Sequence, residues 1–415
     1  MIYTRLLLLS LLPLFAFSQT YSLKNLVQHA NKNNKNIYAK ELLSKSKLKE
    51  VDAQKSTFWP TLDVGGSYTH LSQNSLVSPG KTTTGYVNVA MDIYDGGRKE
   101  ALQRAKEYAY EASLFERKAF EKSVTLDIVN RFYTVKKYQA NLHALREKAK
   151  DLHAHIKRMQ KFEGAGLAMQ DEVDKLQAVY DDNDYSIESI KLAIVTGLDN
   201  IGLQSGQSVS KLKKSYIKEP KNVRFEPFES IKIVDANVNA LQENAKAIDA
   251  GYQPQVKVEN TYSKMNYGDT VDSGFGDILQ DHQNTLQFSV NMRLFDNGKM
   301  KKEKEALQYQ KLALQSENEQ MLSKQKMNFK LAKKQMKTIR TQLKSAKSGL
   351  RAATSSYRTI MKQYEEGLVD HVTYLDALSD KSAALSRVKE VAYDYEITKS
   401  IYYYYAGKDP KEFIK

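Results

Sequence analysis

The sequence predicts a mainly α-helical fold with a small β component, built by internal duplication and exported from the cytoplasm. Three observations predict it: landmarks that recur about two hundred residues apart, two long stretches with a seven-residue apolar period, and four short segments of alternating apolar and polar residues. The 415 residues include only 7 Pro and no Cys. Long helices are therefore expected, and disulfides and thiolate metal sites are excluded.

The duplication rests on three landmarks in the same order. Ile93–Arg98 (IYDGGR) recurs as Leu294–Lys299 (LFDNGK), and Gly166-Leu167 recurs as Gly367-Leu368, both 201 residues later. The segments around Pro60 and Pro254 are 194 residues apart, so the second copy has seven more residues between its Pro and its Asp-Asn-Gly. This order indicates a duplication rather than chance similarity.

The N-terminus predicts export. Arg5 precedes the apolar run Leu6 to Phe17, and small residues at positions 16 and 18 are typical of a signal-peptide cleavage site, here after Ser18. The alternative is an uncleaved anchor. The run is shorter than the ~20 apolar residues of a membrane-spanning helix, and no other stretch approaches that length.

Four segments of about ten residues alternate between apolar and polar side chains, which predicts two β-hairpins at residues 60–94 and 254–295. This length and pattern suit tilted transmembrane strands with lipid on one face and water on the other. Four strands cannot close a barrel, so several copies must combine, and three copies would supply twelve strands. The alternative is a half-buried sheet on a soluble core.

Long helices are predicted at residues 97–161 and 298–363. In the second, apolar residues recur every seven residues from Leu322 to Tyr364, with a second row from Gln325 to Ile360, which indicates coiled-coil packing. Turns containing Gly follow at 162–171 and 364–370, and return helices are expected at 172–203 and 371–406. Each long helix should therefore form a hairpin with its return helix.

These elements give a complete plan of the chain, in which each repeat opens with a further helix before its β-hairpin. The predicted segments are a signal peptide at 1–18, a first repeat at 19–206, a linker at 207–228, a second repeat at 229–406 and a C-terminal tail at 407–415.

Charge is unevenly distributed within a net charge of +14. Residues 299–362 contain 17 basic and 4 acidic residues (+13), and residues 98–161 contain 16 and 8 (+8). The return segments are acidic, with 2 basic and 9 acidic residues at 162–206 (−7) and 4 and 8 at 364–406 (−4). We expect each basic helix to pair with its acidic successor. A nucleic-acid surface is disfavoured by the signal peptide, and a plain solvated face is the remaining alternative.

With these landmarks the whole mature chain resembles the TolC-like outer-membrane factor family. The resemblance rests on the duplicated plan, the strands that open after Pro, the two tip turns and the two strand exits. The tip turns contain Gly166, Leu167, Gly367 and Leu368. The strand exits consist of Asp95, Gly96, Gly97, Asp296, Asn297 and Gly298.

The resemblance implies a homotrimer in the outer membrane of a Gram-negative bacterium, with a twelve-stranded β-barrel in the lipid and a helical tunnel in the periplasm. It implies a passive exit duct of a tripartite efflux or type I secretion system, with a periplasmic adaptor (a membrane fusion protein) and an inner-membrane pump as partners. Glu172 and Tyr364 would tie the closed tips, and Asp376 would be a lumen carboxylate. The sequence departs from the family pattern at Val369 and Thr373.

Enzymatic functions find little support, and we expect no catalytic residue, cofactor or metal site. His153 and His155 are two residues apart, so on a helix their side chains point to different faces and are poorly placed to share a metal. We expect both side chains to be solvated. Pro79–Thr82 (PGKT) lacks the first Gly of a phosphate-binding loop. Besides the duct, a periplasmic coiled-coil adaptor and a structural protein of the cell envelope remain as alternatives.

Overall fold

The computed structural model describes residues 20–270 and 279–415, so the predicted signal peptide at 1–18 lies outside the described residues. Contacts divide the chain into two compact units. The first holds the described residues up to Tyr38 with Phe120–Glu226 and Gln325–Lys415, and the second holds Ala39–Ala119 and Pro227–Lys324. Each unit therefore contains parts of both sequence repeats.

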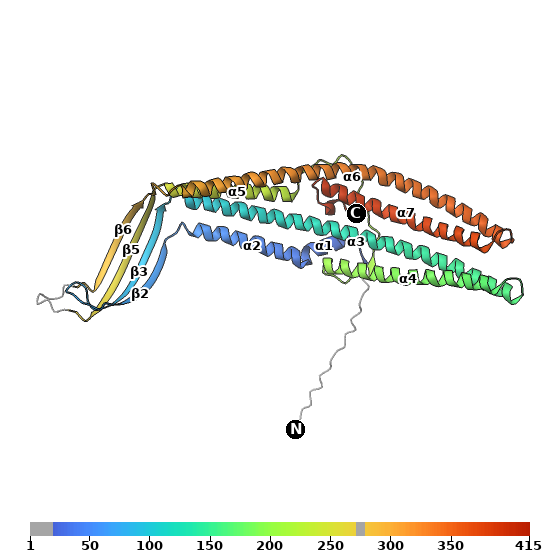
Figure 1. The fold of residues 1–415 in the computed structure, drawn as a ribbon, viewed down its shortest axis with the longest axis horizontal. Coiled ribbons are helices and arrows are strands. Elements are labelled where there is room, and N and C mark those ends of the chain that lie inside the picture. The colour runs from blue at the N-terminus through green and yellow to red at the C-terminus, as the bar shows by residue number, and fades with distance from the viewer. Residues whose placement is uncertain (1–19, 271–278) are drawn as a thin grey trace, which may run out of the picture. The chain divides into compact units, whose positions relative to one another are not determined.

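The predicted class, mainly α with a β component and an internal duplication, is confirmed by the element order (Figure 1). Two helices of 67 residues each, α3 and α6, occupy equivalent places in the two repeats. The helices are α1 Leu23–Asn33, α2 Lys35–Ser56, α3 Arg98–Gly164, α4 Gln170–Ser205, α5 Glu229–Asp249, α6 Lys299–Glu365 and α7 His371–Tyr405. The strands are β1 Thr20–Tyr21, β2 Thr61–His70, β3 Lys81–Tyr94, β4 Lys211–Leu212, β5 Gln255–Gly268 and β6 His282–Asn291, and short 3-10 helices lie at Ala250–Tyr252 and Pro410–Phe413.

The second unit contains a four-stranded antiparallel sheet in the order β2-β3-β5-β6, which joins the two predicted hairpins. The register places apolar side chains of all four strands on one face, and many of them are exposed. The opposite face is polar: the Asn88 amide donates to Glu259 at 2.8 Å, and Lys257 forms an ion pair with Glu259 at 3.0 Å. The apolar face consists of Leu62, Val64, Tyr68, Val87, Val89, Met91, Val256, Val258, Tyr262, Leu286, Phe288 and Val290.

The last strand is shorter than the alternation in the sequence suggests. The apolar alternation continues to Leu294, but β6 ends at Asn291. Asn291 pairs with Gln255, the first residue of β5, so no strand in the described part of the chain lies beside residues 292–295.

In the described residues no helix combines the length and the apolar character needed to cross a membrane.

The first unit has a core between α1, α3, α4, α7 and the C-terminal residues. Phe132 and Tyr133 of α3 are fully buried in it. Tyr403 of α7 stacks on Phe413 with ring centroids 3.6 Å apart, and the buried Lys399 donates to the carbonyl of Ile217 at 2.5 Å. These contacts hold the segment after α4 and the chain end against the helices.

Each basic helix packs against its acidic successor as expected: Asn183 of α4 donates to the carbonyl of Leu145 in α3, and Tyr402 of α7 packs with Ala332 and Met336 of α6. That complementary charge favours this pairing stays a prediction. Among the described residues, no ion pair joins α3 to α4 or α6 to α7.

In the first unit, ion pairs between helices join α3 to α7, where Lys137 meets Asp394 at 2.8 Å, and α3 to α6, where Arg158 meets Glu365 at 3.2 Å. The seam between α6 and α7 contains the buried residues Ala332, Met336 and Tyr402, while the lysines of α6 from Lys324 to Lys347 are exposed.

Candidate functional site

Each long helix starts at an Asp carboxylate that follows the sheet. Asp95 accepts the backbone N–H groups of Gly97, Arg98 and Lys99, and Asp296 accepts those of Gly298 and Met300. Asp296 also accepts the Tyr252 hydroxyl at 3.0 Å. The Met300 N–H bond is the main reason that the pKa of Asp296 lies below its ordinary value. Free N–H groups at a helix N-terminus favour such a carboxylate.

The residues after each Asp turn the chain from strand to helix with left-handed backbone angles. Gly96 has φ of 74°, and an added Cβ there would lie 2.7 Å from the carbonyl oxygen of Ala250, so only Gly fits. Asn297, at the equivalent place, has φ of 57°, a conformation that Asn tolerates. The duplicated strand exits are therefore a duplicated turn and helix cap.

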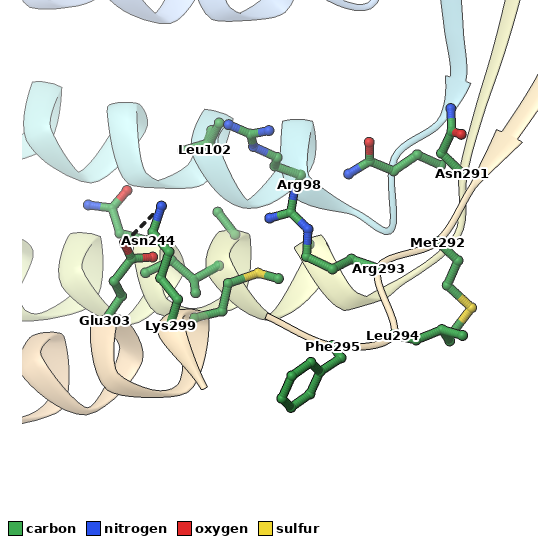
Figure 2. A pocket seen from close by; sticks show the side chains of 15 residues that line it. Arg98, Leu102, Asn244, Asn291, Met292, Arg293, Leu294, Phe295, Lys299 and Glu303 are labelled. Carbon is green, nitrogen blue, oxygen red and sulfur yellow. Dashed lines mark ion pairs between the residues drawn. The ribbon is translucent and has the colours of Figure 1, made fainter. Parts of the chain in front are cut away.

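A pocket of about 830 Å³ lies at this junction, between the starts of α3 and α6 and the end of α5 (Figure 2). Arg98, Arg293 and Lys299 line it together with one acidic residue, Glu303, which lies 3.8 Å from Lys299. Gln255 and Asn291, from the polar face of the sheet, also line it. Since basic side chains exceed acidic ones, the pocket attracts anionic groups.

The two tip turns have the same geometry. Gly166 and Gly367 have φ of 72° and 71°, and the N–H groups of Leu167 and Leu368 each bond to a carbonyl of the long helix at 2.8 Å. Glycine satisfies the left-handed angle that closes a helix in this way. Both leucines project into solvent, with 76% and 69% of their surface exposed. Each turn therefore presents one exposed apolar side chain to solvent.

Next to the tips an aromatic cluster joins α3, α4, α6 and α7. Tyr374 is fully buried at its centre, stacks on Tyr364 with centroids 5.0 Å apart and lies 4.1 Å from the His155 ring. Asp151 of α3 binds two neighbouring helices, because it accepts the Tyr357 hydroxyl at 3.1 Å and forms an ion pair with Lys381 at 3.2 Å. The sequence pattern did not single out Asp151.

The structure places the three predicted tip residues differently. Tyr364 is half-buried in the aromatic cluster, and its hydroxyl donates to the sulfur of Met159 at 3.4 Å. Burial and, next, the charge of Glu172 raise the pKa of Tyr364, and no direct hydrogen bond joins the two side chains in the described chain. Asp376 is exposed on α7, on the opposite side from buried Tyr374.

His155 is buried, so its interpretation as a solvated residue was wrong, while His153 is exposed as expected. The Nδ1 atom of His155 is enclosed and has no hydrogen-bond partner among the described residues. Burial and the nearby Arg158 lower its pKa. Within the described chain no group of three or more His, Cys, Asp or Glu side chains is arranged to hold a metal ion.

Low pH should destabilise the aromatic cluster, because His155 becomes protonated. Its folded pKa lies below the ordinary value of 6.5, so the folded state binds fewer protons than the unfolded state as pH falls below about 6.5, and stability is lost in that window. We expect the drop in melting temperature between pH 7.5 and pH 5 to be smaller in His155→Gln than in the unmodified protein. His153→Gln is the matched control, and an equal drop in both variants would contradict the prediction. Opposing charges near His155 are Asp151 and Glu365, and further titratable groups around the cluster are Arg158, Glu172, Lys381, Tyr357, Tyr364 and Tyr374.

Comparison with known proteins adds a family and a fold. The family model described as outer membrane efflux protein matches residues 26–195 and 229–400, one segment in each repeat. No curated protein matches the chain by sequence.

Solved structures with the same fold come from several bacteria. The outer membrane protein VceC of Vibrio cholerae superposes with a TM-score of 0.78 at 13% identity, over 93% of this chain and 96% of that one. The CmeC outer membrane channel of Campylobacter jejuni has a TM-score of 0.79 at 14% identity, over 93% and 85%. The MtrE outer membrane channel of Neisseria gonorrhoeae, in its open state, has a TM-score of 0.73 at 14% identity, over 93% and 89%.

Proposed function

Because the chain belongs to the outer membrane efflux protein family, we propose that it is the outer-membrane channel subunit of a tripartite efflux or type I secretion system, a passive exit duct without catalytic activity. The observation that carries the proposal is the four-stranded sheet, which has one exposed apolar face and one polar face. The two helical hairpins with exposed leucines at their tips support it.

The sheet requires other copies. Val64 and Phe288 expose 77% and 67% of their surface, which suits contact with lipid. Both outer strands, β2 and β6, have one edge that pairs with no other strand of the described residues, and unpaired backbone groups are not tolerated in lipid. A homotrimer would join these edges into a closed barrel of twelve strands with the polar face inside.

We place the trimer in the outer membrane of a Gram-negative bacterium, with its helices in the periplasm and its signal peptide removed. The tip turns at Gly166-Leu167 and Gly367-Leu368 are then the contacts for a periplasmic adaptor, which links the duct to an inner-membrane pump. A coiled-coil adaptor or a structural envelope protein has no need of an exposed apolar sheet face, so neither alternative explains this feature.

We further propose that the tips form the gate. After burial, the charge of Glu172 contributes to the raised pKa of Tyr364, and direct contact between the two groups would form a charge-assisted hydrogen bond. Asp376 is exposed, and threefold repetition would make it a ring of carboxylates that favours cations.

Single-channel recording in planar bilayers tests the gate. Glu172→Ala combined with Tyr364→Phe should raise the conductance, since both partners of the tie are removed. Asp376→Asn should shift the reversal potential toward lower cation selectivity. Asp199→Asn, an equal change of charge at an exposed position on α4, is the control. Unchanged conductance and reversal potential would reject these gate residues.

The same preparation tests the function itself. Purified full-length protein in detergent should have the mass of a trimer and should insert into bilayers as discrete channels. A stable monomer that never conducts would reject the duct, whatever the gate variants do.

A further inference from the structure

The two duplicated strand exits differ in one pair of residues. Both exits keep the capping Asp and the left-handed turn, and the offset of 201 residues aligns Asp92 with Arg293. The same offset aligns Lys99 with Met300. In the first repeat, Lys99 forms an ion pair with Asp92 at 3.2 Å. The second repeat therefore has a guanidinium group in place of the carboxylate and a methionine in place of the lysine.

Arg293 shares a pocket with a second guanidinium group. Arg98 and Arg293 both line the pocket between the starts of α3 and α6, and Figure 2 shows the Arg293 side chain directed away from the strand exit and toward Arg98. Neither side chain forms an ion pair or a hydrogen bond with any residue that the structure describes. Two guanidinium groups without a counterion thus lie in one pocket.

The other charges of the pocket cancel each other. Lys299 and Glu303 form an ion pair at 3.8 Å, and Glu303 is the one acidic side chain among the described residues of the lining. Three basic side chains and one acidic side chain leave a net charge of +2. Like charges held in one pocket repel each other, and a bound anion would offset this repulsion.

Three amide side chains, those of Asn244, Gln255 and Asn291, also line the pocket. None of them forms a side-chain hydrogen bond with another residue in the described part of the chain, so their N–H groups are available to a ligand. The helix N-termini add little, because Asp95 and Asp296 already accept backbone N–H groups there. The donors that face a ligand are therefore the guanidinium and amide groups.

We propose that this pocket binds the phosphate group of a soluble molecule, held between the guanidinium groups of Arg98 and Arg293. A phosphate group carries a charge of about −1.5 to −2 at pH 7, which matches the excess charge of the pocket, whereas one carboxylate would neutralise half of it. Guanidinium groups bind phosphate oxygens through two parallel hydrogen bonds each, and the amide groups can donate to the remaining oxygens.

A phospholipid is the other source of a phosphate group, since apolar side chains lie beside the pocket. Leu294 and Phe295 expose 82% and 79% of their surface. Gln255 and Asn291, however, pair on the polar face of the sheet, where a lipid tail finds no apolar contact. The lining therefore favours a solute that arrives from water.

The proposed ring of copies would not supply the missing counterion. In that ring the outer edge of β6 joins the outer edge of β2 in the next copy, and antiparallel pairing brings the start of β2 beside the end of β6. Residues 53–62, which lead into β2, contain no acidic residue. Each copy in a trimer would therefore keep its own site.

Isothermal titration calorimetry with inorganic pyrophosphate tests the site on the full-length protein, in an uncharged detergent and a phosphate-free buffer of low ionic strength. We expect one binding event per chain. Arg98→Gln and Arg293→Gln should each weaken it roughly tenfold or more, because each removes charge-assisted hydrogen bonds. Lys301→Gln is the matched control, since it removes one positive charge from an exposed neighbour outside the pocket. Absence of binding to the unmodified protein, or equal weakening in the control, would overturn the site.

A variant that copies the first repeat separates binding from folding. Arg293→Asp combined with Met300→Lys recreates the residue pair of Asp92 and Lys99, so the strand exit should stay folded while pyrophosphate binding is lost. Undiminished binding by this variant, with circular dichroism like that of the unmodified protein, would reject Arg293 as a ligand-binding residue.

A short-chain phosphatidylglycerol, titrated below its critical micelle concentration, distinguishes the two sources of phosphate. Binding of this lipid without binding of pyrophosphate would overturn the soluble ligand and assign the pocket to a lipid headgroup. The titrations involve no transport, so their failure is distinguishable from failure of the proposed function. A protein that conducts in bilayers but binds neither probe would reject the phosphate site and leave the duct intact.

Discussion

Replacing Tyr374 with Ala is expected to lower the free energy of opening the aromatic cluster next to the tips by about 3–5 kcal/mol, the usual cost of removing a large buried aromatic side chain. Tyr374 is fully buried and lies between the rings of His155, Tyr357 and Tyr364, so no other side chain can fill the space that it leaves. Hydrogen exchange by mass spectrometry should show the loss as a protection roughly a hundredfold or more lower in peptides covering residues 145–180 and 350–380.

Tyr374→Phe is the matched control. The Tyr374 hydroxyl is buried and makes no hydrogen bond of standard geometry with any residue that the structure describes. Its removal should leave protection nearly unchanged, because only an unsatisfied polar group is lost. A large loss of protection in Tyr374→Phe would show that the hydroxyl, and not the packing of the ring, holds the cluster together.

Replacing Phe288 with Lys should destabilise the protein in a bilayer by about 2–4 kcal/mol, since a charged side chain in the middle of a lipid-facing strand is costly. Phe288 lies in the interior of β6, in the apolar row with Val258 and Met91. Denaturant unfolding of protein reconstituted in lipid vesicles measures the change.

The control for this variant is Gln287→Lys, one residue away on the polar face. Gln287 pairs with Glu259, so the new charge meets water and a carboxylate. The proposal requires Gln287→Lys to cost much less than Phe288→Lys. Equal costs would show that the two faces of the sheet are in the same environment, which a duct wall does not permit.

The periodic parts of the fold were the most predictable from the sequence. A seven-residue apolar repeat indicates which side of α6 is buried, and Ala332, Met336 and Tyr357 are buried as that pattern requires. A period reports the angle of each side chain around its own helix, so it holds wherever the helix lies.

Contacts between distant segments were less predictable. His155 was interpreted as solvated, and Asp151 was not singled out, because both lie on α3 and their surroundings come from α6 and α7, more than two hundred residues away in the chain. The tie between Glu172 and Tyr364 stays a prediction, and the sequence could not show that the Tyr364 hydroxyl bonds to Met159.

By itself the sequence determined the duplication, the alternating strands, the helical hairpins and the charge of each helix, because these depend on residue type and on spacing along one segment. Only the tertiary structure decided how the two β-hairpins join into the sheet β2-β3-β5-β6, and which helices supply the surroundings of His155. The tertiary structure also decided which charged side chains of α6 are exposed. Buried Ala332, Met336 and Tyr402 form the seam between α6 and α7, and the lysines of α6 from Lys324 to Lys347 are exposed beside it.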